Sequence, residues 1–167
     1  MRLEQKIAET LIRDKKTIGI AESCTGGLLT HRLTNISGSS RFLMATVVSY
    51  SDESKKKILK VPSVLIKKHG AVSLPVAKRM AQGIRRLLKT DFGISITGIA
   101  GPTGGTPQKP LGLTFIGIAG GTKIICEKNI FKGTRLQVKE QAATRAMRLL
   151  KNFLIRINLA PSSFNAL

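Results

Sequence analysis

Apolar side chains recur along this chain with two different periods, and these periods predict its helices and strands. Residues 2–15 place Leu3, Ile7, Leu11 and Ile12 at helical spacing, which predicts an amphipathic helix. Further helices are expected over residues 26–35, from Asp52 or Glu53 to Pro62, and over 63–68, 74–89 and 134–157. Short apolar or β-branched runs predict strands over residues 17–21, 42–50, 92–97, 111–119 and 123–131.

The order of these elements predicts the fold class. Helices alternate with strands in the first two thirds of the chain, and Gly120-Gly121 then joins the last two strands as a two-residue hairpin. We expect an α/β fold, a three-layer α/β/α sandwich with a mixed, mostly parallel sheet in a single domain. The domain is expected over residues 1–160, and residues 161–167 are expected to fray.

The amino-acid composition indicates what kind of core this domain has and in which cellular compartment it is expected. Aromatic residues make up only 4% of the chain and Trp is absent, so the core is expected to be mainly aliphatic. Two cysteines, Cys24 and Cys126, are too few for a disulfide framework, and no metal-ligand spacing is present. Residues 1–16 are charged and amphipathic, and no apolar run is long enough to span a bilayer. We therefore expect a cytoplasmic protein with no membrane partner and no metal.

The formal net charge of +19, from 28 Lys and Arg against 9 acidic residues, is large. Nucleic-acid binding is one interpretation of such a charge. The basic residues, however, occur in small clusters along the whole chain without aromatic residues between them, and no nucleic-acid-binding motif is present. A generally basic, solvated surface is the preferred interpretation, and it would also attract a small anionic substrate.

The stretch from Ile20 to Gly27 predicts a strand, a tight turn and the start of a helix. Ser23 would stand at the turn, and Gly26 and Gly27 would let another molecule approach the backbone closely. N–H groups of the first helical turn form an anion-binding position. The alternative is that Ser23 or Thr25 serves only as a helix N-cap.

Two other strand ends carry unusual residues, Ser49–Lys55 and Gly98–Gly105. If the strands are parallel, all three stretches meet at one edge of the sheet, where ligands of open α/β sheets bind. The glycine-rich loop suits a phosphate or carboxylate, although it matches neither a Walker loop nor a dinucleotide fingerprint. The alternative is a long connecting loop shaped by turns.

Lys55 stands among three consecutive lysines, which by itself suggests a solvated helix face. Beside an exposed serine, however, a lysine kept neutral can act as a general base. The histidines His31 and His69 are poorly placed for a Ser-His-Asp arrangement and are expected to be structural or solvated. Arg135 opens the last helix, either as a surface residue or sharing an anion with the helix N-terminus.

Five motifs, in order, resemble those of the CinA carboxy-terminal domain family, which includes the stand-alone PncC-type nicotinamide-nucleotide amidases. The resemblance runs from about residue 3 to about residue 155. The motifs are Ala21 to Gly27, Val47 to Lys55, Gly70 to Ser73, Gly98 to Gly105 with Lys109 to Gly112, and Phe131 to Arg135.

This resemblance implies a metal-free and cofactor-free deamidation of nicotinamide mononucleotide (NMN) to nicotinic acid mononucleotide and ammonia. Ser23 matches the family's serine, Lys55 its motif lysine and Tyr50 its motif tyrosine, a candidate proton relay or orienting group. The resemblance also implies a homodimer or larger homo-oligomer.

The expected substrate contacts are inferred from the anionic groups that must be bound and from the positions of the matching motifs. Backbone groups near Thr25 and Gly26 are expected to hold the oxyanion, and the loop with Arg135 to hold the 5′-phosphate. The expected substrate-binding residues are Thr25, Gly26, Gly27, Gly101, Thr103, Gly104, Gly105 and Arg135.

Four positions depart from the family's usual motifs. Asp52 stands where Asn is usual, Gln108 where an acidic residue is frequent, Thr134 where Asp is usual, and Lys139 where a second Arg is common. A second function class also stays open, a non-catalytic domain that binds a nucleotide or nucleic acid, in keeping with the family's link to competence and DNA damage. Cations around a pocket with Ser23 would favour the enzyme, and a separate basic stripe would favour binding.

Overall fold

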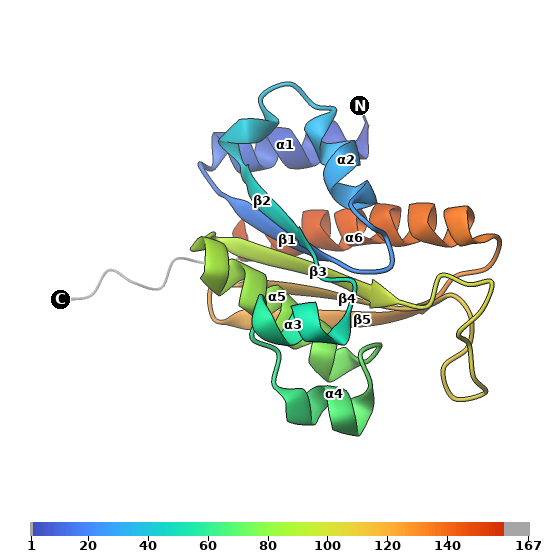
Figure 1. Cartoon of the computed structure of the whole chain (residues 1–167). Helices are drawn as coiled ribbons and strands as arrows, with labels where there is room; N and C mark the ends of the chain where they lie inside the picture. Colours follow the sequence, from blue (N-terminus) through green and yellow to red (C-terminus); the bar gives the residue numbers. More distant parts are fainter. Residues whose placement is uncertain (1, 159–167) are drawn as a thin grey trace.

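The computed structural model describes residues 2–158, so the expected tail at 161–167 lies outside the described residues. Helices and strands alternate as expected (Figure 1). The helices are α1 (Leu3–Arg13), α2 (Leu28–Thr34), α3 (Asp52–Lys57), α4 (Ser63–His69), α5 (Leu74–Leu88) and α6 (Arg135–Asn158), with a short 3-10 turn at Ser39–Arg41. The strands are β1 (Ile18–Glu22), β2 (Leu43–Val48), β3 (Phe92–Gly98), β4 (Leu113–Gly120) and β5 (Lys123–Ile130).

The five strands form one mixed sheet in the order β2-β1-β3-β4-β5. β1 pairs in parallel with both β2 and β3, whereas β4 runs antiparallel to β3 and to β5. Only β4 therefore runs against the other strands, and the expected single-domain α/β fold with a mixed sheet is confirmed. The ends of β1, β2 and β3 consequently meet at one edge of the sheet.

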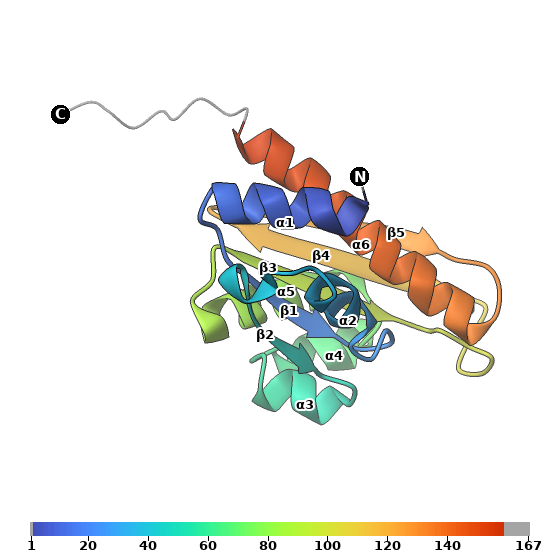
Figure 2. The same ribbon diagram turned by 90° about the horizontal axis from the view of Figure 1, so that it is seen from above.

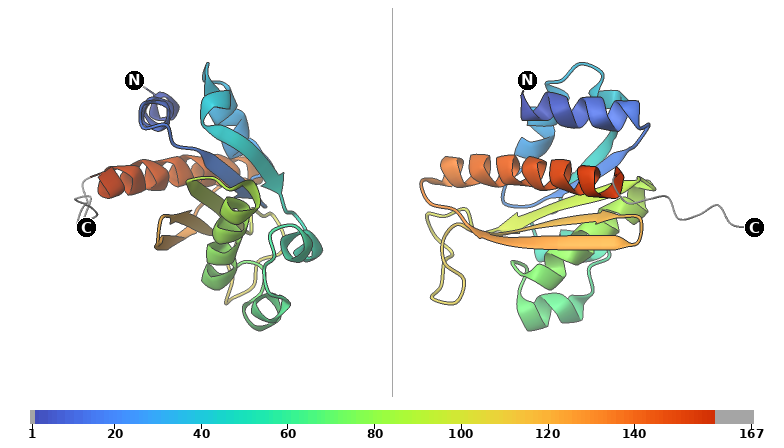
Figure 3. Two further views of the ribbon diagram at one scale, coloured as in Figure 1. Left: turned by 90° about the vertical axis from the view of Figure 1, so that its left-hand side faces the viewer. Right: turned by 180° about the vertical axis from the view of Figure 1, so that it is seen from behind.

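Helices cover both faces of this sheet, which gives the expected three layers (Figures 2 and 3). α1, α2 and α6 pack together on one face, where α6 contacts β3 and β4. α5 lies on the other face against β1, β3, β4 and β5, with α4 packed on its outer side. The central strands β1, β3 and β4 are therefore buried between helices, whereas β2 and β5 at the sheet edges are partly exposed.

Alternation of residue size along the central strands gives the two faces different shapes. Isoleucines line the face under α6, at positions 18, 20, 94, 96, 116 and 118. The opposite face carries Gly19, Gly93 and Gly117, with Gly19 paired to Gly93. A Cβ on Gly93 would lie 2.1 Å from the carbonyl oxygen of Ala81. The α5 backbone can therefore approach the sheet only because these side chains are absent.

Several element boundaries differ from those expected; α3, for example, ends at Lys57 rather than at Pro62. α2 begins at Leu28 rather than at residue 26, because Gly26 and Gly27 have left-handed backbones, with φ of 62° and 96°. β2 ends at Val48, so Ser49 and Tyr50 follow the strand instead of belonging to it. β4 begins at Leu113, and residues 111 and 112 belong to the preceding loop.

Candidate active site

The three unusual strand ends do converge at the carboxyl edge of the sheet. They line one pocket of about 250 Å³, together with the start of α6. Ser23 follows β1, Lys55 lies on α3 beyond β2, and Gly101 and Thr103 lie in the loop after β3. Arg135, the first residue of α6, completes the pocket wall. The parallel pairing of β1 with both neighbours brings these segments together.

Ser23 and Lys55 form the centre of this pocket. Lys55 Nζ lies 3.2 Å from Ser23 Oγ, which is hydrogen-bond distance. Lys55 is only 2% exposed although both neighbouring lysines reach solvent, and Ser23 is buried as well. The other contacts of Lys55 Nζ are the carbonyl oxygens of Ser49 at 2.8 Å and Tyr50 at 3.4 Å. These uncharged acceptors orient the amine without pairing it to a carboxylate.

Burial sets the protonation behaviour of Lys55. Removal from water lowers the pKa of this amine below its ordinary value, since desolvation disfavours the charged form. Asp52 acts in the opposite direction and raises the pKa. Cys24 itself is buried beside Ser23, and burial raises its pKa to about 11. Its thiol is therefore protonated at neutral pH, and Ser23 is the better placed nucleophile.

The N-terminus of α2 is occupied by the protein's own carboxylate. Glu22 is fully buried, and it accepts hydrogen bonds from the N–H groups of Gly27 at 3.0 Å and Thr30 at 2.9 Å. It also accepts from Leu29 N–H at 3.3 Å. The expectation of a ligand anion at this position is therefore wrong, because Glu22 already satisfies the donors. The alternative is wrong too, because the N-cap is Gly27 and neither Ser23 nor Thr25 caps the helix.

Four of the expected substrate-binding residues line the pocket: Gly101, Thr103, Gly104 and Arg135. The other four, Thr25, Gly26, Gly27 and Gly105, lie outside its wall. Gly105 faces Leu111, with 2.9 Å between a built Cβ and Leu111 Cδ2. The N–H of Gly26 donates to Ser23 O at 3.0 Å, so it is already used in a turn. The expectation that the N–H of Gly26 holds the oxyanion is therefore wrong, and the same role for Thr25 stays a prediction.

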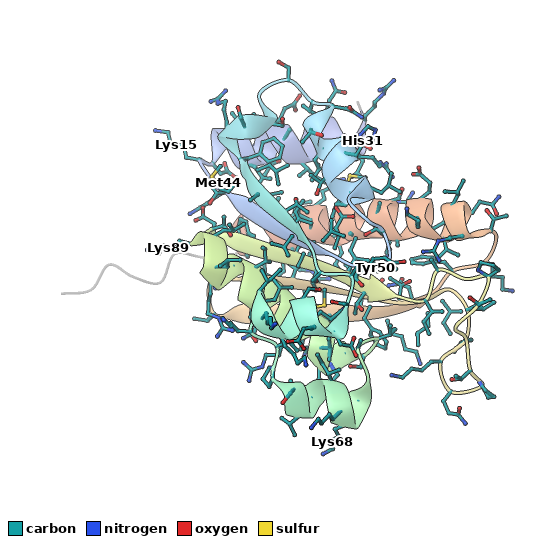
Figure 4. All side chains as sticks on the ribbon, viewed as in Figure 1. Lys15, His31, Met44, Tyr50, Lys68 and Lys89 are labelled. Carbon is teal, nitrogen blue, oxygen red and sulfur yellow. The ribbon has the colours of Figure 1, made fainter. Side chains whose placement is uncertain are left out.

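Tyr50 has a different partner from the one expected. Its side chain is 60% exposed at the carboxyl edge of the sheet, where Figure 4 labels it. Its hydroxyl accepts a hydrogen bond from Arg135 Nη2 at 2.8 Å, and Arg135 Nη1 donates to Gly101 O at 2.7 Å. Only the backbone oxygen of Tyr50 reaches Lys55. Tyr50 and Arg135 thus form a bridge across the pocket mouth.

Sequence reasoning missed the contact that holds the glycine-rich loop. Lys109 Nζ donates to the carbonyl oxygen of His69 at 2.5 Å, which fastens the loop to the end of α4. The two residues lie 40 positions apart, and no local pattern indicates their contact. His69 contributes only its backbone here, and His31 lies exposed on α2. Both histidines lie apart from the Ser–Lys pair.

Two further properties of residues 2–158 bear on the class of site. No three His, Cys, Asp or Glu side chains in this range gather as metal ligands would. No helix in the same range is both long and apolar enough to cross a membrane.

Fold and site together define a single-domain α/β protein with a buried Ser–Lys pair at the carboxyl edge of its sheet. A model of the CinA C-terminal domain family matches residues 1–154, and the chain belongs to that family. A CinA-like protein from Syntrophus aciditrophicus is 50% identical over 153 residues, which cover 91% of this chain but 36% of that protein. The chain thus spans little more than a third of the length of this curated relative.

Solved structures agree with this assignment over nearly the whole domain. A CinA superfamily protein from Klebsiella pneumoniae 700603 is 33% identical, with a TM-score of 0.89, and covers 92% of this chain and 96% of its own. A competence/damage inducible protein from Agrobacterium tumefaciens is 29% identical, with a TM-score of 0.84, covering 95% and 97%. The similarity therefore extends to the domain as a whole.

Proposed function

We propose that this chain is an amidohydrolase that converts NMN to nicotinic acid mononucleotide and ammonia. The observation that carries the proposal is the 3.2 Å separation of Lys55 Nζ and Ser23 Oγ inside a pocket. A serine hydroxyl is a weak nucleophile until a neighbouring base takes its proton. Burial lowers the pKa of Lys55, which increases the fraction of amine able to accept that proton.

The chemistry follows from this pair. Neutral Lys55 accepts the Ser23 proton as Oγ attacks the carboxamide carbon, and the resulting ammonium donates a proton to the departing amine. A C–O bond forms, the C–N bond breaks, and ammonia leaves an ester on Ser23. Water, deprotonated by Lys55, then hydrolyses the ester, releasing the carboxylate product and restoring Ser23.

The pocket suits a ligand with an amide at one end and an anion at the other. Ser23 lies in the pocket interior, whereas Arg135 lies at the mouth beside Tyr50 and the glycine-rich loop. A guanidinium can form two hydrogen bonds to a phosphate. NMN, with a carboxamide and a 5′-phosphate, combines these features. The family resemblance supports the same substrate.

Ammonia release from NMN tests the proposal. The wild-type chain is compared with Ser23→Ala and Lys55→Met, and with matched controls Ser40→Ala and Lys57→Met, which change exposed residues. We expect Ser23→Ala and Lys55→Met to lose about 10³-fold or more in kcat, and both controls to retain activity. Equal release by wild type and Ser23→Ala would contradict the nucleophile, and no release by a folded wild type would contradict the substrate.

A further inference from the structure

Most of the positive charge of this chain lies outside the pocket that contains Ser23 and Lys55. Two cationic side chains, Lys55 and Arg135, line it, whereas the chain has a formal net charge of +19. Another group of cations lies at the amino-terminal edge of the strands. This edge is the far end of the sheet from Ser23, because β3 begins at Phe92 beside it and ends at Gly98 in the pocket wall.

Two adjoining hollows lie at this edge. One, of about 450 Å³, lies at the end of α5 and includes Arg85, Arg86 and Lys89. The second, of about 330 Å³, lies between the α1–β1 connection and the β4–β5 turn and includes Lys16, Arg85 and Lys123. Arg85 lines both. We call these five side chains, Lys16, Arg85, Arg86, Lys89 and Lys123, the basic face.

Carboxylates do not balance the basic face. Among the described residues that line the two hollows, Asp91 is the one acid, and it is already paired with Lys16 at 2.9 Å. α5 has no Asp or Glu from Leu74 to Leu88, so Arg85, Arg86 and Lys89 repel one another without an acidic partner on that helix. Arg85 is held in place by donating to Gly121 O at 2.8 Å.

Two lysines at this end of the molecule have left-handed backbones. Within residues 2–158, the non-glycine residues with positive φ are Lys15, Lys60 and Lys89, at 51°, 56° and 53°. Lys15 precedes Lys16 of the basic face, and Lys89 belongs to it; Figure 4 shows both at the side of the molecule away from Tyr50. A left-handed lysine costs roughly 1 kcal/mol relative to glycine. Lys89 is the C-cap of α5, where a left-handed residue commonly ends a helix.

We propose that the basic face binds the phosphodiester backbone of double-stranded nucleic acid, independently of sequence. Cations from three separate elements suit a polymer with regularly repeated phosphates better than a single small anion. The aromatic side chain that lines the hollows, Phe92, is buried against Phe153 and offers no exposed ring on which single-stranded bases could stack. The backbone of a duplex presents several phosphates at once, so it can contact cations that line two adjoining hollows.

Fluorescence anisotropy of a fluorescein-labelled, random-sequence DNA duplex tests this binding. Wild-type affinity is expected to fall about 10²-fold between about 50 mM and 200 mM salt, as several phosphate contacts imply. Arg86→Glu/Lys89→Glu should weaken binding at least about tenfold and reduce the salt slope by about 2. The matched control is Lys67→Glu/Lys68→Glu, which changes the net charge equally on α4, where Figure 4 labels Lys68 far from the basic face.

Three outcomes would overturn the proposal. Equal weakening by both double variants would mean that overall charge, not this face, attracts the duplex. Absence of binding by the wild-type chain would exclude double-stranded nucleic acid as the partner. Tighter binding to phosphatidylserine-containing vesicles than to the duplex would assign the face to a membrane surface.

Circular dichroism checks that the variants fold. Ammonia release from NMN is measured separately and should be unchanged in Arg86→Glu/Lys89→Glu, because the face lies outside the catalytic pocket.

Discussion

Glu22 accepts two hydrogen bonds from Thr30, one from its N–H at 2.9 Å and one from its hydroxyl at 2.8 Å. Glu22 immediately precedes Ser23, so this contact ties the turn that carries the serine to the first turns of α2. The position that could have bound a ligand's anion instead holds a fixed carboxylate. In the proposed reaction, Arg135 and the glycine-rich loop are therefore the groups left to attract an anionic substrate group.

Replacement of Glu22 tests this anchoring role. Glu22→Ala leaves buried N–H donors of α2 without an acceptor, so we expect a loss of about 3 kcal/mol in the free energy of unfolding. Glu22→Gln keeps one acceptor oxygen and should cost less. Urea unfolding measures both changes as a lower midpoint with an unchanged slope. An unchanged midpoint for Glu22→Ala would show that the carboxylate does not anchor the turn.

The pH dependence of amide hydrolysis should follow Lys55. The amine must be neutral to accept the Ser23 proton, so kcat/KM should rise with pH as Lys55 loses its proton. Because burial lowers the pKa of Lys55, the midpoint of this rise should lie below the ordinary value of about 10.4. A steady-state pH profile of ammonia release measures the midpoint.

Asp52→Asn tests whether Lys55 sets the midpoint of that pH profile. Asp52 raises the pKa of Lys55, so removing its charge should move the midpoint to lower pH and increase the rate at neutral pH. Asn is also the residue usual at this position in the related motifs. A midpoint that stays in place, or moves to higher pH, would mean that another group is the base.

Tyr50→Phe separates a bridging role from proton transfer. Because the Tyr50 hydroxyl contacts Arg135 rather than Lys55, we expect kcat to fall less than about tenfold. Loss of a proton-transfer group would instead lower kcat by about 10²–10⁴-fold. Ammonia-release kinetics distinguish the two results, and a loss in the larger range would restore Tyr50 as a relay.

Arg135→Ala should mainly raise KM for NMN, with a smaller effect on nicotinamide riboside, which lacks the phosphate.

Close packing of α5 on the sheet can be tested with two Gly→Ala changes. A Cβ on Gly93 meets backbone, the Ala81 carbonyl oxygen at 2.1 Å, which cannot rotate away. A Cβ on Gly19 meets the end of the Leu88 side chain at 2.8 Å, which can move. We expect Gly93→Ala to lose about 3 kcal/mol of stability and Gly19→Ala clearly less. Thermal unfolding compares them, and equal losses would contradict this account of the interface.

Several features of the fold could be predicted from local pattern alone. The alternation of isoleucine with glycine or serine from Phe92 to Thr97 is sufficient to indicate a strand, because side-chain direction repeats every two residues. Gly120-Gly121 likewise predicts the hairpin through its turn geometry. The motif order around Ser23 and Lys55 predicts both the family and the pair that the structure brings within hydrogen-bond distance.

Apart from the Ser23–Lys55 pair, only the tertiary structure decided which partners the polar side chains around the pocket take. The run of three lysines does not show which of them is buried, and Lys55 is buried because its amine contacts Ser23 in the pocket. In the same way, Tyr50 contacts Arg135 across 85 residues and Lys109 contacts His69 across 40. Sequence periodicity reports which face of an element is buried, but long-range packing determines what lies opposite that face.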